Sequence, residues 1–240
     1  MDFLILVTGY NCAPLVKPCY DSIINQKGEH NIVAVFISDG STDGTDKEVL
    51  KLEGCYKTIG QHNKGAAYRR FMAIKELSKE EDIIILLGMD DELLPNAIDQ
   101  IKKEYEQGKL MTYGNWQSDK QTKFPPSMLY FDEATHENRD YRKVKYRSTH
   151  ICTFKRKLFD KLTEEDFKVN GEWIKATTES PVMFACLEMC GKERIGIIET
   201  PIYFYRDRGK NNARKRLGDT YQNTIYKEII SRPKFPLYER

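Results

Sequence analysis

Short apolar runs alternate with polar, helix-like stretches along the first half of the chain. Runs of this length and character are typical of strands buried inside a sheet; here they are Phe3–Thr8, Asn31–Ser38, Lys57–Gln61, Asp82–Leu87 and Leu110–Gly114. Helices are expected between them, from Pro14, from about Thr45 to Glu53, from Lys64 to Leu77 and from Pro95 to about Gln107. The alternation predicts an α/β fold with a Rossmann-like, mostly parallel central sheet and helices on both faces.

The second half has a less regular pattern. Residues 116–147 are polar and rich in proline and charge, so we expect a long functional or mobile loop there. The pattern beyond the loop predicts a strand at His150–Phe154, a short helix from Lys155, a helix at Ser180–Met189, strands at Arg194–Glu199 and Ile202–Tyr205, and a final helix from about Leu217 to Ile230. These elements can complete the same domain.

Polar residues follow the strands at the edge where parallel sheets bind their ligands. The first strand ends in TGYN, which comprises Thr8, Gly9, Tyr10 and Asn11, and the second ends in SDGSTDGT with Asp39 at its tip. The central strand ends in GMDDELLP, with adjacent carboxylates at Asp90 and Asp91. An ionised Asp is rarely enclosed without a partner such as a metal ion. For Asp91, the alternative is a favourable charge at the start of the helix that follows.

Composition and charge exclude several classes of protein. Hydrophobic residues make up 40% and charged residues 31%, which is typical of a globular domain, and the net charge is +2. A balance so close to zero does not favour a nucleic-acid partner. No apolar run reaches the roughly 20 residues of a membrane span. Two residues precede the first strand and the six cysteines form no CxxC pair, so we expect a cytoplasmic protein with reduced thiols.

Five ordered features together resemble the family 2 glycosyltransferases, which are inverting enzymes with the GT-A fold. They are TGYN, SDGSTDGT, the HNKGAAYRR segment, GMDDELLP, and a late TTES followed by IYFYR. The resemblance implies transfer of a sugar from a nucleotide diphosphate-sugar to an acceptor hydroxyl, with a UDP-sugar as the default donor. It also divides the single domain into a nucleotide-sugar half, residues 1–115, and an acceptor and catalytic-base half, residues 116–240.

The resemblance assigns donor-side roles by position. It implies a base pocket at the end of the first strand, a base or ribose contact at Asp39, and a nucleotide-sugar wall made by Asn63, Lys64, Gly65 and either Arg69 or Arg70. Asp90 stands where the family holds Mn²⁺ or Mg²⁺, and Asp91 lies beside it as a second candidate ligand. The first acid of the family's D-x-D motif is replaced by Gly88, which puts metal affinity and sugar preference in question.

A basic loop, Arg206–Arg216, begins at the end of the IYFYR strand and includes Arg208 and Lys210. Family members often carry a metal-binding His there, and this chain has none in DRGKNN, so these cations could share the neutralisation of a diphosphate. A solvated or acceptor-binding face is the alternative interpretation of this loop.

The acceptor side depends on a base that takes the hydroxyl proton. The family places an acidic pair at a helix start, where this chain has Glu179 and Ser180, so Glu179 is the candidate base. A carboxylate favoured by the helix dipole is the alternative, and the other base candidates are Asp132, Glu133 and Asp140 in the long loop. Trp116 and His150 are candidate acceptor contacts, although packing explains either residue as well.

Other functions remain to be separated from glycosyl transfer. The run Arg139–Arg147 interleaves cations with tyrosines, and an anionic acceptor or a solvated lid fits it better than nucleic acid. A nucleotidyltransferase would begin with a Gly-rich, basic loop after the first strand, and TGYNCAP supplies neither. The replacements at Gly88 and Ser180 keep open a sugar-nucleotide or glycan-binding module that has lost its chemistry. No GxGxxG follows a strand, which disfavours a dinucleotide enzyme.

Overall fold

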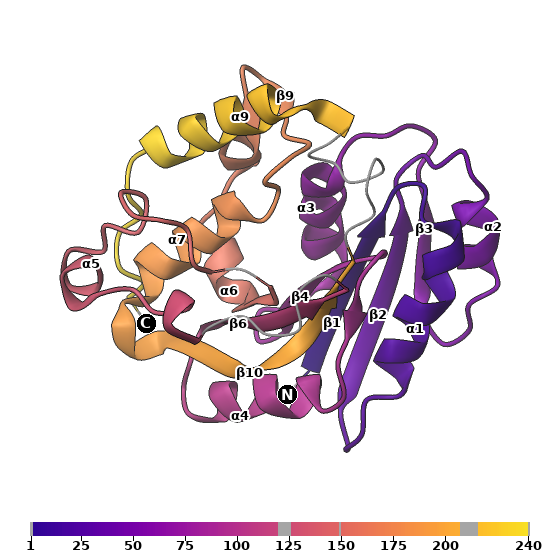
Figure 1. The fold of residues 1–240 in the computed structure, drawn as a ribbon, viewed down its shortest axis with the longest axis horizontal. Helices are drawn as coiled ribbons and strands as arrows, with labels where there is room; N and C mark the ends of the chain where they lie inside the picture. The colour runs from indigo at the N-terminus through magenta and orange to yellow at the C-terminus, as the bar shows by residue number, and fades with distance from the viewer. Residues whose placement is uncertain (1, 120–125, 149, 207–215, 240) are drawn as a thin grey trace.

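One curled sheet with helices on both faces forms the body of the protein (Figure 1). The computed structural model describes residues 2–119, 126–148, 150–206 and 216–239. The strands of the main sheet are β1 (Asp2–Gly9), β2 (Asn31–Ser38), β3 (Tyr56–Ile59), β4 (Ile83–Gly88), β5 (Glu92–Leu93), β6 (Met111–Ser118), β7 (Cys152–Lys155) and β10 (Ile195–Tyr205). A separate small hairpin pairs β8 (Lys168–Val169) with β9 (Glu172–Trp173).

The strand order brings the ends of distant strands to one edge. Across the sheet the order is β3-β2-β1-β4-β7-β6-β10-β5. Strands β3, β2, β1 and β4 are parallel, and β7 runs antiparallel to both β4 and β6. Because β6 and β10 are parallel to each other, two reversals restore the direction of β4. The carboxyl ends of β1, β2, β4, β6 and β10 therefore share one edge, as expected for a ligand site in an α/β sheet.

Helices cover both faces, so alternate residues of the central strands enter two separate cores. The helices are α1 (Val16–Ile24), α2 (Thr45–Leu50), α3 (Ala66–Leu77), α4 (Ala97–Glu106), α5 (Glu133–Asn138), α6 (Arg156–Phe159), α7 (Ser180–Cys190) and α9 (Asp219–Ser231), with 3-10 turns at Ala13–Leu15, Pro126–Met128, Glu164–Phe167 and Lys192–Arg194. In β1, Phe3 and Ile5 pack toward α1 and α4, whereas Leu4 and Leu6 pack toward α3, α7 and α9. This two-sided burial explains the nearly continuous apolar runs.

A buried ion pair joins the elements of the second half. Glu188 on α7 accepts hydrogen bonds from Arg142 Nε (2.6 Å) and Nη2 (3.0 Å), and from the backbone N–H of Phe235 (3.0 Å). Arg139 donates to the carbonyls of Glu188 (2.8 Å) and Phe235 (3.0 Å). Two cations of the basic run therefore fasten α7 to the C-terminal tail. These two arginines therefore belong neither to an anionic-acceptor site nor to a solvated lid, which were the two interpretations of this run.

Two further regions differ from the sequence pattern. The two strands predicted on either side of Pro201 are one strand, β10, whose register against β6 shifts between Ile198 and Tyr203. A bulge accommodates the proline without ending the pairing. The region expected as an irregular loop contains α5, which Asp132 caps by accepting a hydrogen bond from the Thr135 N–H (2.7 Å). Because α5 has only six residues and few of them are apolar, its sequence shows no helical periodicity.

All six cysteines are free thiols, and all except Cys55 are buried. Within the described ranges, no helix combines the length and apolar character needed to cross a membrane.

Candidate active site

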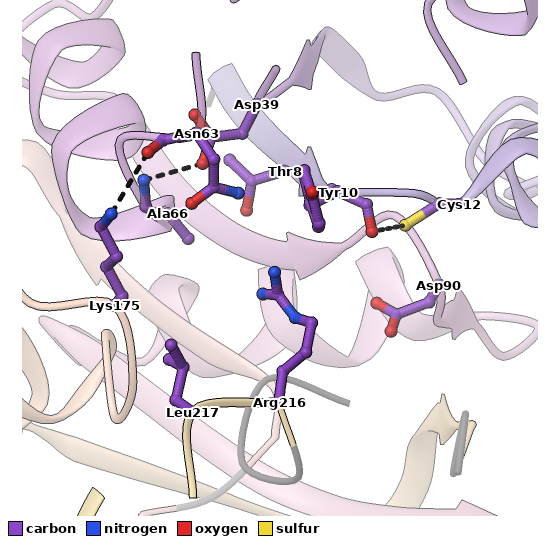
Figure 2. Close-up of a pocket in the computed structure, with 12 residues that line it drawn as sticks. Thr8, Tyr10, Cys12, Asp39, Asn63, Ala66, Asp90, Lys175, Arg216 and Leu217 are labelled. Carbon is purple, nitrogen blue, oxygen red and sulfur yellow. Dashed lines mark hydrogen bonds between the residues drawn. The ribbon is translucent and has the colours of Figure 1, made fainter. Parts of the chain in front are cut away.

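A cavity of about 340 Å³ opens at the carboxyl ends of β1, β2 and β4 (Figure 2). Its wall combines strand ends, the segment before α3 and two distant loops. The lining residues are Thr8, Gly9, Tyr10, Cys12, Asp39, Asn63, Gly65, Ala66, Asp90, Lys175, Arg216 and Leu217. The structure thus brings together most of the donor-side residues selected from the sequence, together with Arg216 from the end of the basic loop and Lys175, which the sequence did not single out.

Backbone contacts between strand ends build the floor of this cavity. The N–H of Met89 donates to the Thr8 carbonyl (2.9 Å), and the N–H of Asp39 donates to the Gly9 carbonyl (2.9 Å). A Cβ at Gly9 would lie 2.5 Å from the Cβ of Met89 and 2.9 Å from the sulfur of Cys12. Such distances are not tolerated, so glycine is required where the ends of β1 and β4 meet.

The Asp39 carboxylate organises the wall that carries Asn63. It accepts hydrogen bonds from the backbone N–H groups of Lys64 (3.0 Å) and Gly65 (2.7 Å), and from Arg69 Nε (2.7 Å). A carboxylate has about four acceptor positions, so one remains for a ligand. The side chains of Lys64 and Arg69, which the resemblance assigned to the nucleotide wall, do not line the cavity within the described chain.

Two cations enter the cavity from the second half of the chain. Lys175 precedes α7 and donates from Nζ to the Asn63 carbonyl (3.3 Å). The guanidinium of Arg216 lies 4.5 Å from the centre of the Tyr10 ring, and Figure 2 shows it extending toward Tyr10 and Thr8. Neither residue belongs to a recognisable local motif, because tertiary contacts over more than a hundred positions bring them here. They place positive charge beside a cavity that also holds two aspartates.

The adjacent carboxylates Asp90 and Asp91 have different surroundings. Asp90 lines the cavity, whereas Asp91 is 5% exposed and accepts hydrogen bonds from the Tyr203 hydroxyl (2.5 Å) and the Arg206 N–H (2.8 Å). Burial, together with the charge of Asp90, raises the pKa of Asp91 well above its usual range. Asp91 therefore fixes β10 to the tip of β4. The side chain of Arg206 pairs with Glu92.

The donor atoms at this site determine how it could hold a divalent ion. Within the described ranges, no group of three or more His, Cys, Asp and Glu side chains is arranged to hold a metal. A Cβ at Gly88 would lie 2.7 Å from Asp91 Oδ2 and 2.8 Å from Asp90 Oδ1, so the family's first acid at this position would displace both carboxylates. Mg²⁺ commonly uses one or two carboxylates and takes its other ligands from phosphate and water. Asp90 fits such an ion, bound with the donor.

Glu179 lines a second cavity of about 370 Å³, close to the tip of β4. Arg70 on α3 pairs with the Glu179 carboxylate and also donates to the Leu87 carbonyl at the end of β4 (3.5 Å). Burial raises the pKa of Glu179, but the charge and hydrogen bond of Arg70 outweigh it and leave this pKa below its ordinary value. Glu179 is at the start of α7 and makes no capping hydrogen bond with its side chain. Its partner is therefore the arginine rather than the helix terminus.

The other acceptor-side candidates have different positions. His150 lines the second cavity, and its ring stacks on Tyr203 with the ring centres 4.6 Å apart. Burial lowers the pKa of His150, so the ring is neutral at pH 7. Trp116 packs edge-on against Tyr205, with the ring centres 5.6 Å apart, and lines neither cavity within the described chain.

The alternative base candidates and two donor-side candidates lie elsewhere. Asp132 caps α5, Glu133 pairs with Lys192, and Asp140 pairs with Lys143 and Lys234. None of the three lines the Glu179 cavity. The side chain of Asn11 accepts a hydrogen bond from the Thr42 N–H (2.8 Å) and so joins two turns. Arg208 lies outside the described residues.

Comparisons with known proteins agree with this architecture. A family model described as Glycosyl transferase family 2 matches residues 4–163. The uncharacterized glycosyltransferase EpsJ of Bacillus subtilis (strain 168) is 24% identical over 221 residues, which cover 85% of this chain and 60% of that protein. The chain thus spans about 60% of the length of this relative.

Similar solved structures share the fold at low sequence identity. The S. aureus TarS 1–349 structure in complex with UDP-GlcNAc has a TM-score of 0.68 at 18% identity, covering 89% of this chain and 60% of that one. The mannosyltransferase PcManGT from Pyrobaculum calidifontis, in complex with GDP-Man and Mn²⁺, has a TM-score of 0.62 at 16% identity, covering 98% and 65%. The predicted α/β fold of the GT-A type is confirmed by this likeness.

Proposed function

The chain belongs to glycosyl transferase family 2, and we propose that it transfers a sugar from a nucleotide diphosphate-sugar to an acceptor hydroxyl with inversion at the anomeric carbon. One observation carries the proposal. A single cavity at the ends of β1, β2 and β4 contains Asp39, Asp90 and two cations, Lys175 and Arg216. These groups suit a ligand with a polar base at one end and a diphosphate at the other.

The donor assignment follows from the chemistry of the wall. The nucleoside would lie against Thr8, Gly9 and Tyr10, with the remaining acceptor position of Asp39 available to it. The diphosphate would lie beside Lys175 and Arg216, whose positive charges attract its oxygens, and Asp90 would reach it through a divalent ion. A UDP-sugar is the default donor, which the UDP-GlcNAc complex of TarS supports, and GDP-Man in PcManGT supports GDP as the alternative.

Asp90 would hold Mn²⁺ or Mg²⁺ together with the donor diphosphate. When bound, such an ion neutralises the charge that develops on the leaving phosphate oxygen. Lys175 and Arg216 contribute to the same neutralisation through charge-assisted hydrogen bonds, which are stronger than bonds between neutral groups.

Glu179 is proposed as the base for the acceptor hydroxyl. In the inverting step the acceptor oxygen forms a bond to the anomeric carbon, the bond to the phosphate oxygen breaks, and the hydroxyl proton passes to Glu179. The pairing with Arg70 supports this role in one respect, since it keeps the carboxylate ionised at neutral pH. The same pairing weakens the base, so proton transfer has to accompany attack rather than precede it.

A panel of nucleotide sugars tests the proposed function. Thermal shift and release of nucleotide diphosphate are measured with and without Mn²⁺ for the wild type, Asp90→Ala and Glu81→Gln. Glu81 is the matched control, because it is an exposed carboxylate just before the opposite end of β4. We expect one donor to stabilise the protein and to be turned over only with metal and Asp90. Binding that ignores both would contradict the proposal, and binding without turnover would favour a sugar-nucleotide or glycan-binding module that has lost its chemistry.

A further inference from the structure

The cavity around Glu179 has a wall with hydroxyl, amide and aromatic groups. Its side chains include Tyr146, Ser148, Gln222, Asn223 and Tyr226. The last three lie on α9, beyond the residues 4–163 that the family model matches. Cavities of about 300–1,000 Å³ with a few convergent polar groups are typical of ligand sites. The volume of about 370 Å³ falls within that range.

Two hydroxyl groups on this wall have at most each other as a hydrogen-bond partner in the described part of the chain. Ser148 is fully buried, and the hydroxyl of Tyr146 is also enclosed. The Ser148 hydroxyl acts on the Tyr146 hydroxyl as a hydrogen-bond partner, and neither hydroxyl has another partner within the described ranges. Buried hydroxyl groups normally find a partner. A hydrogen bond between the two uses only one of their O–H donors, so the hydroxyls that border this cavity can still bind a ligand rich in hydrogen-bonding groups.

The charge of the wall constrains that ligand. Glu179 is its only acidic or cationic side chain among the described residues, and Arg70 balances that charge from behind. His150 is neutral because burial lowers its pKa. Arg139 and Arg142 are engaged by Glu188 and the C-terminal tail. An anionic acceptor would therefore approach a carboxylate without a counter-charge on the described wall, which is unfavourable at a desolvated site.

We propose that this cavity binds the acceptor and that the acceptor is a neutral sugar, an inference that rests on the proposed glycosyl transfer. The hydroxyl and amide groups match the hydroxyl rim of a pyranose ring, and Tyr226 offers an aromatic face to its apolar side. The acceptor hydroxyl then lies next to Glu179, which closes the same cavity. The helix α9 determines acceptor specificity through Gln222 and Asn223.

An array of immobilised oligosaccharides tests this proposal, with each neutral glycan matched by uronic, sulfated or phosphorylated forms. The full chain is supplied with Mn²⁺ and the donor found by the nucleotide-sugar panel. We expect transfer to at least one neutral glycan. The double variant Gln222→Ala/Asn223→Ala should raise the acceptor KM at least about tenfold, since two hydrogen bonds are lost. Thr224→Ala, an exposed neighbour on α9 outside the cavity, should not change it.

The outcomes separate this proposal from the proposed function. If no nucleotide sugar binds, the proposed glycosyl transfer itself is contradicted. If a donor binds but no neutral glycan is modified, or only anionic glycans are, the neutral-sugar assignment is wrong. An unchanged acceptor KM in the double variant would show that the acceptor binds elsewhere. Donor affinity measured without acceptor should stay within about twofold of wild type in that variant, because α9 lies outside the donor wall.

Discussion

Replacing Arg70 by methionine should move the acid limb of the pH–rate profile upward. Arg70 is 8% exposed and pairs with Glu179, which is 31% exposed. In the wild type, burial raises the pKa of Glu179, but the arginine lowers it by more, so the pKa lies below the ordinary 4.5. Activity that needs the ionised carboxylate is therefore present above pH 4.5 and lost as the pH falls through this lowered pKa.

The size of the shift follows from the lost charge. An opposite charge at hydrogen-bonding distance lowers a carboxyl pKa by about 1–3 units, which is about 1.4–4 kcal/mol. In Arg70→Met the effect of burial on this pKa is opposed only by His150 and by the backbone hydrogen bond of Glu179, so the acid limb should rise by about that amount. Unfolding stability at pH 7 should also fall, by about 1–3 kcal/mol rather than the 3–5 of a fully buried pair, because Glu179 is partly exposed.

The assay is the pH dependence of kcat/KM for the acceptor, which reports ionisations of the free enzyme. Arg69→Met is the matched control: this neighbouring arginine pairs with Asp39 instead, so the variant should weaken donor binding without moving the acid limb. Arg70→Lys keeps the charge and should keep the limb near its wild-type position, which separates electrostatics from lost packing. An acid limb unmoved in Arg70→Met would refute Glu179 as the base.

Three further results are expected. Glu188→Gln should lower the free energy of unfolding in urea by about 3–5 kcal/mol, because it leaves Arg142 buried without its charge partner; a loss below 1 kcal/mol would contradict the structural role of this pair. Gly88→Asp, which restores the family's first acid, should weaken rather than strengthen metal-dependent donor binding, measured by titration calorimetry, since the new Cβ would clash with the carboxylates of Asp90 and Asp91. Removal of divalent ions by EDTA should abolish donor turnover and added Mn²⁺ should restore it; full turnover in EDTA would leave the neutralisation to the protein's cations alone.

Local features made the fold and most of the cavity at the ends of β1, β2 and β4 predictable from the sequence. Alternating apolar runs identify buried strands because both faces of β1 and β4 are covered. Thr8 lies at the end of β1, and Asp39 and Asp90 come just after β2 and β4, so the direction of the strands alone brings them to one edge. The predicted family is confirmed by the match over residues 4–163.

Features set by tertiary contacts were not predictable. Asp90 and Asp91 are adjacent in the sequence, and what distinguishes them is the Tyr203 hydroxyl and the Arg206 N–H, more than a hundred residues away. The sequence likewise gives Arg69 and Arg70 as equivalent cations. They point to different carboxylates because neighbouring residues on a helix face different directions.

The second cavity was hidden for the same reason. Its wall comes from the segment before β7, the start of α7 and the middle of α9, which share no local motif. Gln222 and Asn223 are ordinary polar residues of a surface helix when considered by spacing alone. Only the packing of α9 against α7, seen in the contact of Tyr226 with Phe184, places them beside Glu179.

The most direct test of the account is proton NMR of donor turnover, with the anomeric signals followed during the first minutes. The wild type and Glu179→Gln are compared with the stabilising nucleotide sugar, Mn²⁺ and a glycan acceptor from the array. We predict that the wild type consumes the donor and forms a product whose anomeric configuration is opposite to that of the donor, while Glu179→Gln is at least about a hundredfold slower. A product with retained configuration, or equal rates for the two proteins, would contradict the proposed inverting transfer.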